Sequence, residues 1–324
     1  MIAWFVFLTL IAALPWLLQL VAPHLIGVAV LIGIYAILIV GLDLLIGYGG
    51  QVNLGFQGFF AIGAYTTAIL TTGDWVPSAL SEPLAAVVMG CFLAMIAAYI
   101  IALPVLKTEH FYLALVTLAF GMIIYSLAMG LEFLGRSGGI VGIPPFSIGP
   151  LKFRNDFHFY YVVWAFVTLS VFVAFRMVNS QWGLAIRAMR TDEGAAEVVG
   201  INVYKYKLEI FLVTAIYAAV AGSLFAHHMR AISPVMFTIW LVLLVNLGLL
   251  LGGLGTIWGA IIGSALLQFL PEGIAILSHP WPRVLNATEL IYGVIFILIL
   301  FFLPKGILGT TRDVIAKRSI SQIR

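Results

Sequence analysis

Few side chains in this sequence have the type and spacing that chemistry requires. His227 and His228 stand beside Arg230, but no third metal ligand follows at a suitable spacing. No nucleophile is arranged with a general base, and no G-x-x-x-x-G-K-[ST] phosphate-binding loop occurs. We therefore expect no catalytic residue, no metal site and no cofactor, and a protein that is not an enzyme.

Three polar residues within apolar stretches are the next candidates. Asp43 lies about one turn from the end of such a stretch, where it could be an interfacial carboxylate or a gate or contact between helices. Glu209 follows Lys207 closely enough to suggest an interfacial salt bridge. Asn246 is central in its stretch, where an unsatisfied amide costs several kcal/mol. An inter-helix hydrogen bond or a ligand contact would satisfy it.

A polar face also lies on the glycine-rich segment 54–71. Asn53, Gln57 and Gly58 combine amide side chains with a residue that permits close helix approach. Helix packing is one interpretation, and lining of a pathway through the protein is the other. We predict that Asn53, Gln57 and Gly58, together with Asn246, line such a pathway.

The densest charge cluster is MRTDEGAAEVVGINVYKYK, residues 189–207. Asp192 is a suitable N-cap for a short helix, and Glu193 suits its first turn. Gly200 suits the C′ position, where a positive φ costs glycine nothing. Asn202 can then cap the helix that follows. We predict a short capped helix between two longer ones.

One face of this short helix carries small residues. Ala195, Ala196 and Val199 share it by i+3 and i+4 spacing. A solvated amphipathic connector is one interpretation, but a connector gains nothing from such a face. A small-residue face lets a helix fit into a groove on a partner, so we favour a docking site, whose residues are Asp192, Glu193, Ala195, Ala196, Val199 and Gly200.

Composition sets the environment of these elements. Of 324 residues, 63% are hydrophobic and 9% charged, against about a quarter charged in soluble domains. The bilayer must therefore be the solvent, and the expected fold is an all-α polytopic membrane protein, a single transmembrane domain over 1–324. A net charge of +3 is too small and dispersed for nucleic-acid binding. The N-terminus lacks signal-peptide features and is expected to be a retained first span.

A span needs about 20 mostly apolar residues. The expected spans are 2–21, 25–46, 54–71, 84–103, 110–130, 158–178, 208–228, 236–252, 255–271 and 289–303. Segments 54–71, 236–252 and 255–271 are short and glycine-broken and could be half-spans or re-entrant. We expect about 8–10 transmembrane helices, including short or broken ones, and one helix outside the membrane.

Basic residues set the orientation. With alternating spans, eleven of the 16 fall on one side and five on the other. The larger group is Lys107, Arg176, Arg187, Arg190, Lys205, Lys207, Lys305, Arg312, Lys317, Arg318 and Arg324; the smaller is Arg136, Lys152, Arg154, Arg230 and Arg283. The positive-inside rule then places both termini and the loop 179–207 in the cytoplasm. The Gly- and Pro-rich loop 131–157 is left outside, as an ordered cap over the outer mouth.

Several motifs carry a family resemblance. Glu193-Gly-Ala195-Ala196-x-x-x-Gly200-Ile201 resembles the EAA–Gly coupling motif of ABC-importer permeases, with Gly194 as an insertion-like departure. RAMRTDEGAAEVVGINVYKYK is similar to the version in LivM-type permeases of branched-chain amino acid importers. Further similar segments are GYGGQVNLGFQGFFAIGAYTTAIL (47–70), LVTLAFG (115–121), GRSGGIVGIPP (135–145), ISPVMF (232–237), LLGGLGTIWGAIIGSALL (250–267) and LPKGILG (303–309). The resemblance covers about 25–310; departures are Ala260, where the family usually has proline, and an uncharged N-terminus.

The resemblance implies a transport role in the bacterial inner membrane. The chain would be one half of a permease heterodimer, driven by two cytoplasmic ATP-binding subunits and supplied by a periplasmic binding protein. The cargo would be branched-chain amino acids, although related permeases carry urea, short amides or sugars. An ion-gradient-driven secondary transporter or channel is the other alternative. That class would need a charged relay at mid-span, where this sequence is nearly charge-free.

Overall fold

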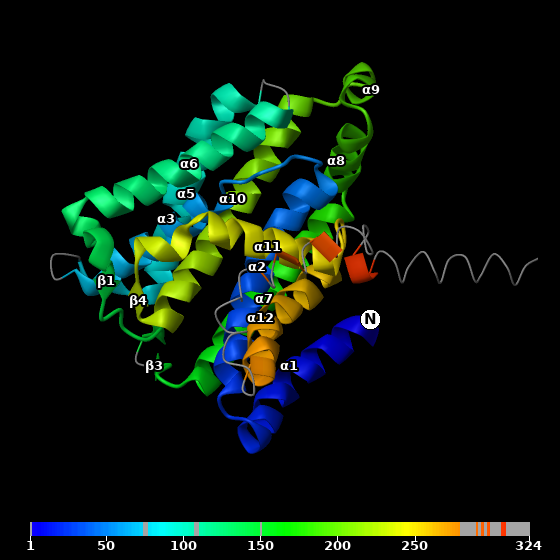
Figure 1. Ribbon diagram of the computed structural model, residues 1–324. Helices are drawn as coiled ribbons and strands as arrows, with labels where there is room; N and C mark the ends of the chain where they lie inside the picture. The colour runs from blue at the N-terminus through cyan, green and yellow to red at the C-terminus, as the bar shows by residue number, and fades with distance from the viewer. Residues whose placement is uncertain are drawn as a thin grey trace, which may run out of the picture.

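The computed structural model describes residues 2–73, 77–106, 110–149 and 151–278, with 290, 293–294, 297–298 and 306–308. Most of the predicted span 289–303 lies outside the described residues. So do Lys107, Arg283 and the basic residues from Lys305 onward. Every predicted span before residue 279 is a helix, which confirms the all-α prediction (Figure 1).

The helices follow the predicted spans closely. They are α1 (Ile2–Val21), α2 (Leu25–Asp43), α3 (Phe56–Thr72), α4 (Ser78–Ser81), α5 (Pro83–Val105), α6 (His110–Gly130), α7 (Asp156–Val178), α8 (Gln181–Thr191), α9 (Glu193–Val198), α10 (Val203–Met229), α11 (Ile239–Gly252) and α12 (Ile257–Ser278). A π-helical turn, η1 (Leu44–Tyr48), ends α2, and 3-10 turns are η2 (Glu132–Leu134), η3 (Arg136–Gly138) and η4 (Pro234–Phe237).

Length and hydropathy select the helices that can cross a bilayer. Within the described residues, five are long enough: α2 with η1, and α5, α6, α7 and α10. Shorter apolar helices occur at Phe7–Leu20, Ile239–Gly252 and Ile257–Leu270. The protein is therefore a multi-pass membrane protein with both full-length and short apolar helices.

The centre of the bundle is formed by α2, α3 and α10. The most apolar window of α2 is 72% buried and that of α10 is 67% buried, against 28% for α5 and α6. A helix that is apolar on all sides is either buried or lipid-facing, and these fractions place α2 and α10 inside. Hydroxyl groups join the central helices, since Ser223 donates to the Gly63 carbonyl (3.1 Å) and Thr214 to that of Gly41 (3.1 Å).

The loop 131–157 is ordered, as predicted. Its strand β1 (Ile140–Val141) pairs antiparallel with β4 (Ala231–Ile232), directly after α10. Strands β2 (Ser147–Ile148) and β3 (Leu151–Lys152) form a small hairpin. His227 is buried beneath this loop, with Nδ1 2.9 Å from the Pro144 carbonyl oxygen. In Figure 1, β1, β3 and β4 lie at the end of the bundle opposite α8 and α9.

Candidate functional site

The predicted short helix is present and capped at its start. It is α9, which follows α8 and stands at the tip of the 179–207 loop (Figure 1). Asp192 has an extended backbone, and its Oδ1 accepts a hydrogen bond of 3.0 Å from the Ala195 N–H. This is the geometry of an N-cap, which satisfies one of the otherwise unpaired donors of the first turn. The prediction that Asp192 is the N-cap is confirmed, and its role in coupling stays a prediction.

The end of α9 is also built as predicted. Gly200 has φ +88°, and its N–H donates to the Glu197 carbonyl at 2.9 Å. The Ile201 N–H donates to the Ala196 carbonyl at 3.0 Å, which completes a Schellman motif. Asn202 Oδ1 accepts from the Lys205 N–H at 3.0 Å and caps α10. Both ends of the loop helix are thus held by local hydrogen bonds.

An ion pair fastens α9 to α10. Lys207 Nζ lies 2.6 Å from a carboxylate oxygen of Glu193, and both side chains are largely shielded from water. The predicted pairing of Lys207 with Glu209 is wrong, because residues two apart on a helix point to different sides. Glu209 instead accepts from the Trp182 indole N–H at 2.8 Å and lies 3.9 Å from Lys205 Nζ.

The exposed face of α9 differs from the prediction by one residue. Ala196 is only 3% exposed and packs within the core, so it does not belong to an outward face. Val198 is 88% and Val199 75% exposed, and Ala195 is exposed beside them. Residues 195, 198 and 199 share a face by i+3 and i+4 spacing. Ala196 faces inward because α9 packs against α8 and α10 on that side. The role of this face in coupling stays a prediction.

A second contact runs from the loop into the membrane helices. The Arg190 guanidinium, on α8, donates a hydrogen bond to the Gly47 carbonyl in η1. Asp43, 1% exposed, accepts the Gly255 N–H at 2.7 Å in the turn between α11 and α12. The Asp43 carboxylate lies directly beside Gly47, so the two contacts adjoin each other. Of the two readings of Asp43, the structure therefore supports the contact between helices.

Arg190 was not among the predicted site residues. It follows Ile186, which is fully buried, by four positions and so lies near the inner side of α8. This four-residue spacing from a buried isoleucine is the feature of the sequence that could have identified Arg190 as a contact residue. Its partner, the Gly47 carbonyl, is 143 residues away in the chain, and no local pattern gives that pairing.

The segment leading into α3 packs tightly against α6. Asn53 is fully buried, and its Oδ1 accepts from the Gly55 N–H at 2.8 Å. The Leu54 N–H donates to Thr117 Oγ1 at 3.1 Å, and Gly58 lies against the Phe120 ring. Asn53 and Gly58 thus hold the start of α3 in place. Their role in a pathway stays a prediction.

Gln57 is the predicted pathway residue that lines a cavity. The cavity has a volume of about 230 Å³ between α3, α6 and the start of α11. Asn246 lies elsewhere, and its Nδ2 donates to the Val242 carbonyl of its own helix at 2.8 Å. The predicted inter-helix hydrogen bond of Asn246 is therefore replaced by an intrahelical one, which satisfies the amide locally.

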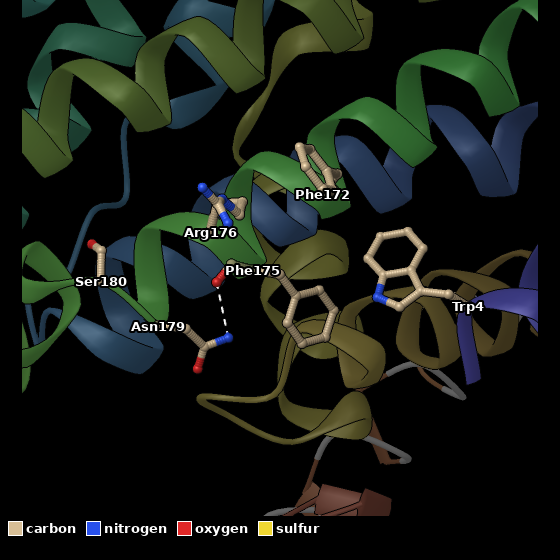
Figure 2. A pocket seen from close by; sticks show the side chains of 6 residues that line it. All are labelled: Trp4, Phe172, Phe175, Arg176, Asn179 and Ser180. Atoms are coloured by element: carbon tan, nitrogen blue, oxygen red, sulfur yellow. Dashed lines mark hydrogen bonds between the residues drawn. The ribbon is translucent and has the colours of Figure 1, made fainter. Parts of the chain in front are cut away.

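A different cavity lies on the α1 side of the bundle. Figure 2 shows its walls, formed by Trp4 from α1 and by residues of α7 and the turn after it: Phe172, Phe175, Arg176, Asn179 and Ser180. Its volume is about 500 Å³. Asn179 Nδ2 donates to the Phe175 carbonyl at 2.9 Å, drawn as a dashed line. None of these six residues belongs to the predicted coupling or pathway sets.

Comparisons with known proteins show which sequences this chain resembles. The family model described as branched-chain amino acid transport system / permease component matches residues 24–303. The chain is 30% identical to the high-affinity branched-chain amino acid transport system permease protein LivM of Salmonella typhimurium, over 97% of this chain and 77% of that protein. It is 31% identical to LivM of Escherichia coli, over 94% and 74%.

Another permease is similar to this chain over a shorter stretch. The permease protein LivH of Escherichia coli is 31% identical over 46% of this chain and 46% of its own length. No solved structure matches this chain.

Proposed function

The chain belongs to the permease family of branched-chain amino acid transport systems, and we propose that it forms one permease half of an ATP-driven importer for branched-chain amino acids. The match over residues 24–303 carries this assignment. The relatives that cover most of the chain are transport permeases rather than enzymes. The whole chain acts as a single transmembrane domain in the inner membrane, with both termini in the cytoplasm.

The partial likeness to LivH supports a second, homologous permease subunit as the partner. The sequence has no phosphate-binding loop, so energy reaches it through separate subunits that bind ATP. Two such cytoplasmic subunits serve the two permease halves, and a periplasmic binding protein delivers the cargo.

In this assembly α9 is the coupling helix. Its Ala195, Val198 and Val199 face docks in a groove of an ATP-binding subunit, since exposed valines in a solvated turn would otherwise stabilise nothing. The Glu193–Lys207 ion pair makes α9 move with α10. The Arg190 hydrogen bond to Gly47 carries the same movement to η1 and, through Asp43, to the turn between α11 and α12.

Uptake by the reconstituted complex tests this function. Proteoliposomes containing this chain, its partner permease and the ATP-binding subunits are loaded with ATP and given labelled leucine with the binding protein. We expect uptake that needs ATP hydrolysis and survives ionophores. Uptake that continues without ATP and stops when ion gradients are collapsed would instead indicate a secondary transporter.

A further inference from the structure

The cavity beside Gln57 has walls of a defined chemical character. Leu118, Gly121, Met122 and Tyr125 of α6 face Phe237, Thr238 and Ile239, which lead into α11, and Gln57 of α3 closes the cavity. Its volume of about 230 Å³ is below the roughly 300–1,000 Å³ typical of sites for drug-sized ligands. The space suits one small molecule.

The walls are mostly apolar and uncharged. Leu118, Met122, Phe237 and Ile239 supply aliphatic and aromatic surface, and none of the lining residues in the described part of the chain carries a charge. Among the lining residues, the polar side chains are those of Gln57, Tyr125 and Thr238. A sugar would leave several hydroxyls against apolar walls, and urea has no apolar surface to bury.

Gln57 indicates that this cavity is more than a gap left by imperfect packing of apolar side chains. Its side chain is buried, at 2% exposure, and its Oε1 has no hydrogen-bond partner among the described residues. A buried amide oxygen without a donor costs free energy, so such atoms call for an explanation. Gly121 lies directly beside the Gln57 amide, where any larger side chain would collide with it. The α6 backbone thus leaves room for this amide at the cavity wall.

We propose that this cavity is a cargo-selecting subsite of the permease, in which the aliphatic side chain of a branched-chain amino acid packs against Leu118, Met122 and Ile239. A rotation of the Gln57 amide turns its unpaired Oε1 into the cavity, where it accepts a hydrogen bond from the ammonium group. The carboxylate stays in water at the open side of the cavity, where Met122 is 61% exposed. The assignment rests on the proposed transport function and adds a selecting site to it. The apolar walls favour a branched aliphatic side chain, and the single buried acceptor holds the polar end. Passage needs weak binding, and one hydrogen bond without an ion pair provides that.

Thiol protection tests the subsite in the assembled complex. Met122→Cys is placed in a Cys91→Ser background, reconstituted in nanodiscs with the partner subunits, and treated with a charged methanethiosulfonate reagent. We expect the thiol to react, and leucine at ten times its Kd to slow the reaction about tenfold by occupancy. Arabinose and urea should leave the rate unchanged. Phe92→Cys on α5 is the matched control: it is 51% exposed but outside this cavity, and it should not react from within the lipid.

A second variant distinguishes a cavity that binds leucine from one that only admits water and the reagent. In the Met122→Cys background, Gln57→Leu should keep the labelling rate without cargo but lose protection by leucine. Ile239 lies on the facing wall and is 54% exposed. Ile239→Cys should therefore be labelled and protected in the same way as Met122→Cys. It replaces Met122→Cys if that variant does not assemble into the complex.

The outcomes that overturn the proposal are distinct from failure of the transport function. Absence of labelling at both positions would mean that the cavity faces lipid or the partner chain. Labelling without protection, in a complex that imports leucine, would remove the subsite and leave the transport function standing. Equal protection by urea or arabinose would refute the assigned cargo class. A wild-type complex that imports no leucine would refute the proposed function itself.

Discussion

At the scale of single residues, Arg190 links the 179–207 loop to a membrane helix. It belongs to a solvent-side helix, yet its guanidinium bonds a carbonyl inside the helix break η1. A π-helical turn at the end of a membrane helix is a common position for functional adjustment, because its backbone ladder is irregular there. Asp43, the last residue of α2 before this break, accepts the Gly255 N–H and so fixes the turn between α11 and α12. Arg190 and Asp43 together therefore connect the loop to the end of α2 and to the turn between α11 and α12.

Replacing Arg190 should uncouple transport from ATP hydrolysis. A hydrogen bond to a charged group contributes about 1.5–3 kcal/mol, and the exposure of Arg190 to solvent places its contribution at the lower end. We expect Arg190→Leu to lower leucine uptake per ATP hydrolysed roughly tenfold. Arg190→Lys should have an intermediate effect, because lysine keeps the charge without the planar fork.

The matched control for this variant is Arg187→Leu on the same helix. Arg187 donates to the Gly183 and Val178 carbonyls, within α8 and to the end of α7, and has no hydrogen bond to η1 among the described residues. Its loss should lower the yield of folded complex while leaving uptake per ATP close to wild type. Wild-type stoichiometry in Arg190→Leu would rule out the transmission route.

At the scale of elements, α9 combines rigid ends with an exposed apolar face. Val198→Asp and Val199→Asp should each weaken binding of the ATP-binding subunit. Burial of a valine contributes about 1.5 kcal/mol or more, and a carboxylate in the groove adds a desolvation cost. We expect at least a tenfold loss of affinity, measured by titrating the purified subunit onto the permease pair in nanodiscs.

Val141→Asp serves as the control, since Val141 is 71% exposed at the opposite end of the bundle. It should leave the affinity unchanged. Equal binding in all three variants would exclude α9 as the docking element.

The helices and their ends could be predicted where neighbouring residues in the sequence determine them. Hydropathy located the spans before residue 279, and side-chain capping rules located both ends of α9. The inward turn of Ala196 could not be predicted, because it depends on packing against α8 and α10 rather than on the helix itself. The bond between Asp43 and Gly255 joins residues 212 positions apart, and the Glu193–Lys207 pair bridges two helices. Such contacts follow from tertiary arrangement, which a single sequence does not display.

At the scale of the whole molecule, the two ends of the bundle differ in construction. One end is a capped loop helix with an exposed valine pair, suited to a moving partner. The other is a hydrogen-bonded cap in which β1 is tied to β4 and His227 is covered by the Pro144 segment. Within the described residues, five basic side chains lie in or beside the loop that carries α8 and α9, and four lie toward the capped end.

Orientation can be tested with the same two valines. In a Cys91→Ser background, Val198→Cys and Val141→Cys place single thiols on the most exposed parts of the two ends. The positive-inside rule predicts that a membrane-impermeant maleimide labels Val141→Cys in intact cells, whereas Val198→Cys reacts only after the membrane is opened. Valine to cysteine is a small change at an exposed site, so folding should be unaffected and both proteins should label fully in detergent. Labelling of Val198→Cys from outside would invert the topology. It would also remove the coupling role of α9, because no ATP-binding subunit operates on that side of the membrane.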